Sequence, residues 1–341
     1  MEVPAPLARY RRDVDAFLKS FLDRDTCARL TRMTRYHMGW EDEAGRSAEN
    51  AGKGLRPSLL LLVCEAAGGD WRRAIPAAAA VELVHNFSLI HDDIQDRDTE
   101  RHHRPTVWSV WGEAQAINAG DALLALARLA LLRLHEEGVP SAAVLQAARA
   151  LDERTLEMVE GQVMDLAFED AGHVGLDEYL SMIEKKTGAL FACSFEIGAL
   201  VGGCETETAE TLGRAGLLLG QAFQIRDDML GIWGAETRTG KEPAADLRRR
   251  KKSLPIVYAL NSGDQVAVEC IGRTYDKGGL SDADVSAALR ALDAINAQGY
   301  CVGQAQQQKE AALDLLAGLR LDEVRSAELR ETAEFLLERD F

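Results

Sequence analysis

The sequence has few aromatic residues, few prolines and fewer basic than acidic side chains. Aromatic residues form 6% of its 341 positions, and eight positions are proline. The net charge of −16 argues against nucleic acid as the main partner, because nothing offsets phosphate repulsion over the chain as a whole. No uninterrupted apolar run of about 20 residues is present, so no membrane span is expected.

Paired cysteines and a leader segment are also lacking. None of the six cysteines belongs to a Cys-x-x-Cys pair, a pattern typical of buried free thiols in a reducing compartment. The first residues show no basic region followed by an apolar one, so no signal peptide is predicted. We therefore expect a cytoplasmic location.

Alanine, leucine, arginine and glutamate dominate a chain that is 47% hydrophobic, a composition typical of helices. No alternating strand pattern, internal repeat or flexible linker is visible. We predict one all-α domain over residues 1–341, a large helical bundle with a central active-site cavity. Helices are expected over 5–23, 25–38, 58–67, 74–96, 107–136 with a break near Gly120 and Asp121, 140–168, 176–202, 206–233, 252–262, 264–273, 281–297, 299–318 and 322–339.

The helix expected over 74–96 ends in the acidic motif Asp92-Asp93-Ile94-Gln95-Asp96. Asp92 and Asp96 lie four residues apart, on one face of the helix. Their charges repel unless a cation lies between them, and Mg²⁺ takes such oxygen ligands together with waters and substrate phosphates. For one motif alone, a solvated helix end is an equally good interpretation.

A second acidic pair, Asp227-Asp228, lies at the end of the helix expected over 206–233. A soluble core helix has no packing reason to end in two aspartates. Two motifs of matching form therefore favour two helices that face each other across a metal-filled cavity over two unrelated helix ends.

Cationic residues lie close to these motifs in the sequence. Lys53 and Arg56 precede a helix start marked by a proline, where backbone amides and the helix dipole favour an anion. His85 lies one heptad before the first acid and faces roughly the same side. The basic turn over 101–106 has arginine forks that match diphosphate oxygens. The plainer alternatives are solvated loops, a satisfied core histidine and simple neutralisation of the acidic helix end.

Two further stretches are unusual for helices. Gly161 lies inside a helical pattern at a cost of about 1 kcal/mol against alanine, which indicates a close approach by another element. Gln162 and Asp165 follow it and share a face. Lys186 and Thr187 lie inside an apolar helix, where they either form a kink with solvated bases or present an ammonium and a hydroxyl to an anion.

The order of these motifs resembles that of the trans-isoprenyl diphosphate synthases. The motifs are Gly-Lys-x-x-Arg-Pro, Asp-Asp-x-x-Asp, an arginine-rich turn ending in Pro-Thr, Gly-Gln-x-x-Asp, Lys-Thr-Gly, Phe-Gln-x-x-Asp-Asp and Lys-Lys-Ser-Leu-Pro. The resemblance covers about residues 50–255, and the last third matches only in being helical. It implies a trans-prenyltransferase of the isoprenoid synthase fold that joins isopentenyl diphosphate head to tail to an allylic diphosphate.

The resemblance also implies roles for the candidate residues. The Mg²⁺ ligands, for about three ions per active site, would be Asp92, Asp96 and Asp227, supported by Asp93 and Asp228. The residues that would bind the allylic diphosphate are Arg101, Lys186, Lys241 and either Lys251 or Lys252. Those of the isopentenyl diphosphate site are Lys53, Arg56, His85 and the position of His102. The residues that would lie by the reacting carbons and help to accept a proton are Thr187 and Gln224.

Four departures from the family pattern are visible. Gly54 replaces a second basic residue, His102 replaces an arginine, Gly231 replaces an outer aspartate of the second acidic motif, and the C-terminus lacks a basic tail. An imidazole anchors a diphosphate more weakly than a guanidinium does and in a pH-dependent way. Two alternatives therefore stay open: a terpene cyclase or hydrolase that acts without condensation, and a regulatory subunit of a hetero-oligomeric synthase. The intact metal ligands and the other intact isopentenyl diphosphate residues favour condensation.

Product length is predicted by resemblance alone. Phe87 lies five residues before Asp92, with the small Ser88 next to it. This pattern resembles geranylgeranyl (C20) synthases, and farnesyl (C15) diphosphate is the second choice. An ordinary core position is the alternative for Phe87. Family members are mostly homodimers, so the expected partners are the two diphosphate substrates and a second copy of the chain.

Overall fold

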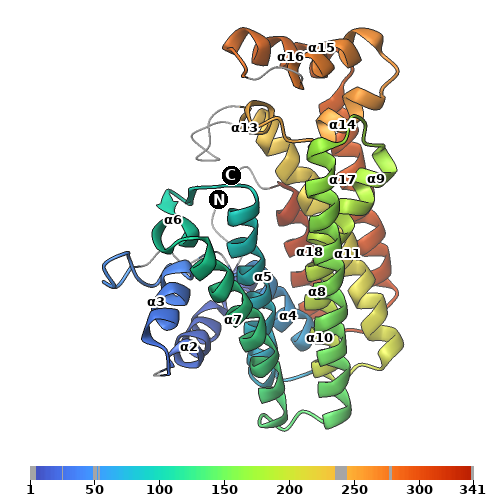
Figure 1. The fold of residues 1–341 in the computed structure, drawn as a ribbon. Helices are drawn as coiled ribbons and strands as arrows, with labels where there is room; N and C mark the ends of the chain where they lie inside the picture. The colour runs from blue at the N-terminus through green and yellow to red at the C-terminus, as the bar shows by residue number, and fades with distance from the viewer. Residues whose placement is uncertain are drawn as a thin grey trace.

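The computed structural model describes residues 5–24, 26–48, 52, 54–234, 244–275 and 279–338. These residues are mostly helical; apart from an isolated bridge between Glu41 and Ser47, their only strands form one short hairpin (Figure 1). No helix within these ranges is both long enough and apolar enough to cross a bilayer. The predicted all-α fold class is therefore confirmed.

The elements up to residue 135 are α1 (Ala5–Ala8), α2 (Arg11–Leu22), α3 (Ala28–His37), α4 (Leu55–Ala66), the 3₁₀ turn η1 (Trp71–Ala74), α5 (Ile75–Gln95), β1 (Glu100–Arg101), β2 (Arg104–Pro105), α6 (Val107–Trp111), α7 (Glu113–Leu132) and the 3₁₀ turn η2 (Arg133–His135). The later elements are α8 (Ser141–Asp170), α9 (Leu176–Ile183), the π-helical turn η3 (Glu184–Gly188), α10 (Ala189–Gly202), α11 (Thr206–Trp233), α13 (Ala245–Arg248), α14 (Leu254–Asn261), α15 (Gln265–Tyr275), α16 (Asp282–Ala294), α17 (Ala297–Ala317) and α18 (Glu323–Glu338).

The centre of the bundle consists of helices that are apolar on almost every face. All residues over 57–64 in α4 and over 189–195 in α10 are buried. α10 packs against α4, α8 and α11, while α5 packs along α7 and α11 packs along α17. Helices of this composition are stabilised by tertiary packing rather than by propensity. They form the rigid support for α5 and α11, while α15 and α16 lie at one end of the bundle (Figure 1).

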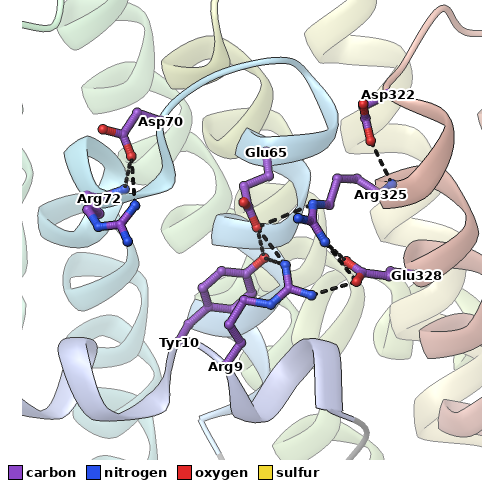
Figure 2. A network of polar contacts seen from close by, with 8 residues as sticks. All are labelled: Arg9, Tyr10, Glu65, Asp70, Arg72, Asp322, Arg325 and Glu328. Carbon is purple, nitrogen blue, oxygen red and sulfur yellow. Dashed lines mark hydrogen bonds and ion pairs between the residues drawn. The ribbon is translucent and has the colours of Figure 1, made fainter.

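A network of charged and polar side chains joins α4 to α18 and to the turn between α1 and α2 (Figure 2). Glu65 of α4 accepts from the Tyr10 hydroxyl and, at 3.0 Å, from Nη1 of Arg9. Glu328 of α18 accepts from Arg9 at 2.5 Å and from Arg325 at 2.8 Å. Tyr10 is fully buried, so the network links the core to the surface where α4, α18 and the turn between α1 and α2 meet.

Most of the predicted helices are present with small shifts at their ends. The prediction over 206–233 is confirmed in full, and that over 74–96 is confirmed within one residue at each end. The predicted break near Gly120 and Asp121 is wrong, because α7 runs through both residues. The chain breaks instead at Gly112, whose φ of +87° separates α6 from α7.

Candidate active site

The two acidic motifs lie near the ends of buried helices that meet at one cavity. α5 and the residue after it carry Asp92 and Asp96, and α11 carries Asp227. The ammonium group of Lys251 interacts electrostatically with Asp96 and with Asp227. Asp93 of the first motif and Asp227 of the second also line a cavity of about 750 Å³. The fold therefore brings together two acidic helices that are far apart in the sequence.

The structure divides the aspartates into two groups according to their surroundings. Asp93 is 1% exposed, and Arg101 Nε donates to its Oδ1 at 2.8 Å. Nη2 of the same guanidinium forms an ion pair with that oxygen at 2.7 Å. Asp228 is fully buried and accepts from two side chains and one backbone N–H. Asp227 is exposed and lines the cavity. In the second motif the two adjacent aspartates therefore differ: Asp228 is held by protein donors, and Asp227 faces the cavity.

Asp92, Asp96 and Asp227 have the chemistry that a magnesium site needs. Burial raises the pKa of Asp92 to about 6, although Lys186 acts in the opposite direction. Burial likewise raises the pKa of Asp96, and a divalent cation would relieve this penalty on the charged form. Among the described residues, no three acidic, histidine or cysteine side chains converge closely enough to hold a metal alone. Carboxylate oxygens are ligands that Mg²⁺ takes together with substrate phosphates and waters.

The lysine and threonine of the Lys-Thr-Gly motif lie in the π-helical turn η3, between α9 and α10. Lys186 Nζ lies 2.5 Å from Oδ2 of Asp165 and is near Asp92. Gly161 of α8 faces this turn, and a β-carbon there would overlap the backbone nitrogen of Lys186 and lie 2.6 Å from its Cα. The close approach predicted for Gly161 is confirmed, and the partner is the backbone that carries Lys186.

One wall of the cavity is built around a buried guanidinium. Arg56 Nη1 lies 3.2 Å from Nε2 of His85, and the guanidinium carbon lies 5.1 Å from the ring centroid of Phe191. Burial lowers the pKa of Arg56 to about 10, while Glu82 opposes this shift. Burial and the nearby arginine hold the pKa of His85 well below its usual value, so its ring is neutral. Arg56 Nε is buried without a hydrogen-bond partner in the described part of the chain, which suits an anionic ligand.

The basic turn over 101–106 contains the β1–β2 hairpin. Arg101 pairs with Arg104, and His102 and His103 form the two-residue connection. Their φ angles of +51° and +59° are those of a hairpin turn that usually contains asparagine and glycine. Side chains with a β-carbon adopt this left-handed conformation at a cost of about 1 kcal/mol or more each. His102 lines the cavity.

The aspartate missing from position 231 has a spatial replacement. Asp246 of α13 is 8% exposed, and a β-carbon on Gly231 would overlap its carboxyl group. The carboxylate interacts electrostatically with Asp228 and with Lys251. The sequence predicts the loss of an outer carboxylate here, but the structure supplies one from a different element. No local sequence pattern predicts the place of Asp246, because its carboxyl group approaches Gly231 only in the folded chain.

The remaining predicted lysines differ in where they lie and in what they contact. Lys53 and Lys241 lie outside the described residues. Lys252 Nζ donates to backbone carbonyl groups around the C-terminal end of α8, at 3.3 Å for Glu169 and at shorter range for Phe168 and Ala171. Lys251 faces acids instead: burial opposes its charge, but Asp246 and other carboxylates raise its pKa above the usual value. Of these two lysines, Lys251 is therefore the one that lies near the acids.

Comparison with known proteins gives consistent results. Residues 41–292 match the family model described as polyprenyl synthetase. The chain is 42% identical over 308 residues to a (2E,6E)-farnesyl diphosphate synthase of Mycobacterium tuberculosis, with 89% of this chain and 84% of the relative covered. It is 40% identical over 313 residues to a geranylgeranyl diphosphate synthase of the same organism, with 91% and 87% covered. The crystal structure of a polyprenyl synthetase from Streptomyces coelicolor has a TM-score of 0.92 at 36% identity and covers 98% of this chain and 100% of its own.

Proposed function

Because this chain belongs to the polyprenyl synthetase family, we propose that it joins isopentenyl diphosphate to an allylic diphosphate and releases a short-chain prenyl diphosphate. The chain is accordingly a trans-prenyltransferase. One observation supports this function above the others: Asp93 of α5 and Asp227 of α11 line the same cavity as the partly buried Arg56–His85 pair. No observation favours the cyclase or the regulatory-subunit alternative.

The acidic side of the cavity would bind the allylic diphosphate. Asp92, Asp96 and Asp227 would hold the Mg²⁺ ions, which when bound neutralise the charge that develops on the leaving diphosphate. Lys186 and Arg101 would bind the same diphosphate, together with Lys251 and Lys241. Asp93 would fix the guanidinium of Arg101, since the two side chains form a partly buried, charge-assisted pair.

The cationic side would bind isopentenyl diphosphate. Arg56 offers a buried, unpaired N–H, and neutral His85 orients its guanidinium. Lys53 and His102 would complete this anion site. With both diphosphates bound, the double bond of isopentenyl diphosphate attacks the allylic carbon as the carbon–diphosphate bond breaks. The proton then lost from the new chain goes to the released diphosphate.

The proposed main product is geranylgeranyl (C20) diphosphate, with farnesyl (C15) diphosphate as the second choice. Phe87 is 7% exposed, and its ring packs edge-on against His91 with a centroid distance of 5.0 Å. An aromatic ring fixed in this way next to the first acidic motif is suited to limiting chain length. Ser88, one turn before Asp92, has a small side chain.

A homodimer formed through α7 and α8 is also proposed. α8 exposes Leu145 (71%), Leu156 (60%) and Val163 (62%), and α7 exposes Ile117 and Leu132. Exposed large apolar side chains of this number on adjacent helices are typical of interaction surfaces. Light scattering at micromolar concentration tests the dimer, and Leu156→Glu should yield monomer. A cytoplasmic location remains a proposal that fractionation of the producing cell would test.

The function itself is tested by incubating the purified protein with Mg²⁺, isopentenyl diphosphate and, in turn, dimethylallyl, geranyl and farnesyl diphosphates. Products are analysed as dephosphorylated alcohols and as volatile hydrocarbons, with Asp92→Ala as the control. Longer prenyl chains that disappear in the control support condensation. Cyclic or free-alcohol products formed without use of isopentenyl diphosphate would refute it, and so would no turnover in the presence of Mg²⁺.

A further inference from the structure

A buried tyrosine outside the motifs is bonded to the second acidic pair. Tyr179 of α9 is fully buried, and its hydroxyl donates to Asp228 Oδ2 at 2.5 Å. The same oxygen accepts from the backbone N–H of Leu254 at 3.1 Å. The other oxygen, Oδ1, accepts from Nε2 of Gln224 at 3.0 Å. Three donors from three helices therefore fix the orientation of this carboxylate.

The fixed carboxylate in turn fixes the amide of Gln224. An ionised carboxylate only accepts hydrogen bonds, so the amide nitrogen of Gln224 must face Asp228 and the carbonyl oxygen must point away. That oxygen accepts from the Thr187 hydroxyl at 2.7 Å. The four side chains thus form one directed chain of hydrogen bonds, and Asp228 determines its direction.

The direction of this chain determines what Thr187 can offer to a ligand. Its only hydroxyl proton is donated to Gln224, so the oxygen has lone pairs left and no proton. Lone pairs stabilise positive charge that develops nearby and accept a hydrogen bond from an acidic C–H or from water. A reversed chain would present a proton instead, which would repel a developing cation.

We propose that Tyr179 is a positioning residue for prenyl transfer: through Asp228 it holds the Gln224 amide in the orientation that leaves Thr187 as an acceptor toward the reacting carbons. The inference rests on the proposed function, in which Thr187 and Gln224 lie by those carbons. In this role Tyr179 itself contacts neither substrate nor metal. Its removal should therefore affect the chemical step and leave substrate binding almost unchanged.

The test is Tyr179→Phe, which keeps the buried ring and removes only the hydroxyl. We expect kcat for chain elongation to fall about tenfold, while the KM values of both diphosphates stay within about twofold. Thr187→Val removes the end of the chain, and in that background Tyr179→Phe should cause little further loss. Asp228→Asn, which retains the carboxyl shape, is the second variant and should lower kcat at least as much.

Tyr10→Phe is the matched control, because Tyr10 is an equally buried tyrosine whose hydroxyl also donates to a carboxylate, that of Glu65 (Figure 2). Neither Tyr10 nor Glu65 lines the cavity. The control should lower stability as Tyr179→Phe does and leave kcat unchanged. The inference would be overturned by an unchanged kcat in Tyr179→Phe, by equal effects on kcat and KM, or by full additivity with Thr187→Val. In each of these cases, elongation by the wild type would still support the proposed function. No elongation by the wild type would overturn both.

Discussion

Gly161→Ala is the substitution whose effect the structure predicts most directly. In most exposed helices this change is stabilising, because alanine has the better helix propensity by about 1 kcal/mol. Here the added carbon would lie 2.6 Å from Cα of Lys186, whereas carbon atoms in contact normally lie about 3.5 to 4 Å apart. α8 and the π-helical turn that carries Lys186 must therefore separate by about 1 Å.

The expected losses follow from that displacement. Overpacking of this kind costs about 1 to 3 kcal/mol, so after the gain in propensity the free energy of unfolding should fall by about 0 to 2 kcal/mol. A displacement of about 1 Å at a catalytic group lowers the rate about 100-fold, which corresponds to about 2.7 kcal/mol of transition-state stabilisation. Catalysis should therefore be affected more than folding.

The assay is steady-state chain elongation with farnesyl and isopentenyl diphosphates, together with urea unfolding. Gly303→Ala is the matched control, since Gly303 lies inside α17 and a β-carbon there meets no atom within 4 Å. The control should gain about 0.5 to 1 kcal/mol of stability with unchanged kinetics. If Gly161→Ala behaved as Gly303→Ala does, the proposed link from Gly161 through Lys186 to catalysis would be refuted.

Four further predictions concern single side chains. Phe87→Ala should lengthen the product, as measured by chromatography of the dephosphorylated alcohols. His102→Arg should lower the KM of isopentenyl diphosphate about tenfold, because a guanidinium replaces an imidazole at a diphosphate site and a charge-assisted hydrogen bond contributes about 1.5 to 3 kcal/mol. Asp246→Asn should raise the Mg²⁺ concentration for half-maximal activity about tenfold, as expected when an outer carboxylate of a metal site is lost. Asp92→Asn should stabilise the metal-free protein at pH 7. Since the pKa of Asp92 is about 6 in the fold against an ordinary 3.8, the native state binds this proton more tightly than the unfolded state. Each pKa unit corresponds to about 1.4 kcal/mol, so above pH 6 the charged carboxylate lowers the free energy of unfolding by on the order of 2 to 3 kcal/mol. The difference in this free energy between Asp92→Asn and wild type should vanish as the pH falls toward 4.

Each of these predictions has an outcome that contradicts it. An unchanged product in Phe87→Ala would remove this ring as the limit on chain length. Equal KM values in His102→Arg and wild type would place the turn outside the isopentenyl diphosphate site. Asp282→Asn, an exposed acid paired with Arg248, is the control for Asp246→Asn, and identical Mg²⁺ curves for the two would exclude a metal-linked role for Asp246. For Asp92→Asn, the measurement is urea unfolding with EDTA at pH 5 and pH 7. If the stability difference between the variant and the wild type does not shrink at the lower pH, burial of the Asp92 charge is not the cause of that difference.

The sequence was sufficient for most of the helices and for the position of both acidic motifs near helix ends, because both depend on local patterns. α5 and α11 show continuous apolar segments that end in aspartates, and Gly161 stands out as a costly residue inside a helix. What could not be predicted depends on contacts between distant segments. Tyr179 and Asp228 are 49 positions apart. The different environments of Asp227 and Asp228 depend on which side of α11 faces α9.

Similar reasons account for the errors of detail. The break expected at Gly120 is absent because a glycine in a buried helix marks close packing as often as a bend, and propensity alone does not separate the two. Lys251 and Lys252 have the same local sequence preference, and only the position of the α8 C-terminus distinguishes the capping lysine from the one that faces the acids.

The His102-His103 turn bears on how this protein balances stability against activity. A hairpin that only had to reverse direction would be more stable with glycine, which adopts left-handed angles without strain. The strain of the two histidines exists in the folded state at all times, whereas any benefit of an imidazole at the cavity arises only when a ligand is bound. Selection for thermal tolerance and selection for turnover should therefore act on these two positions in opposite directions, and a stabilised form of the enzyme would be expected to change them first.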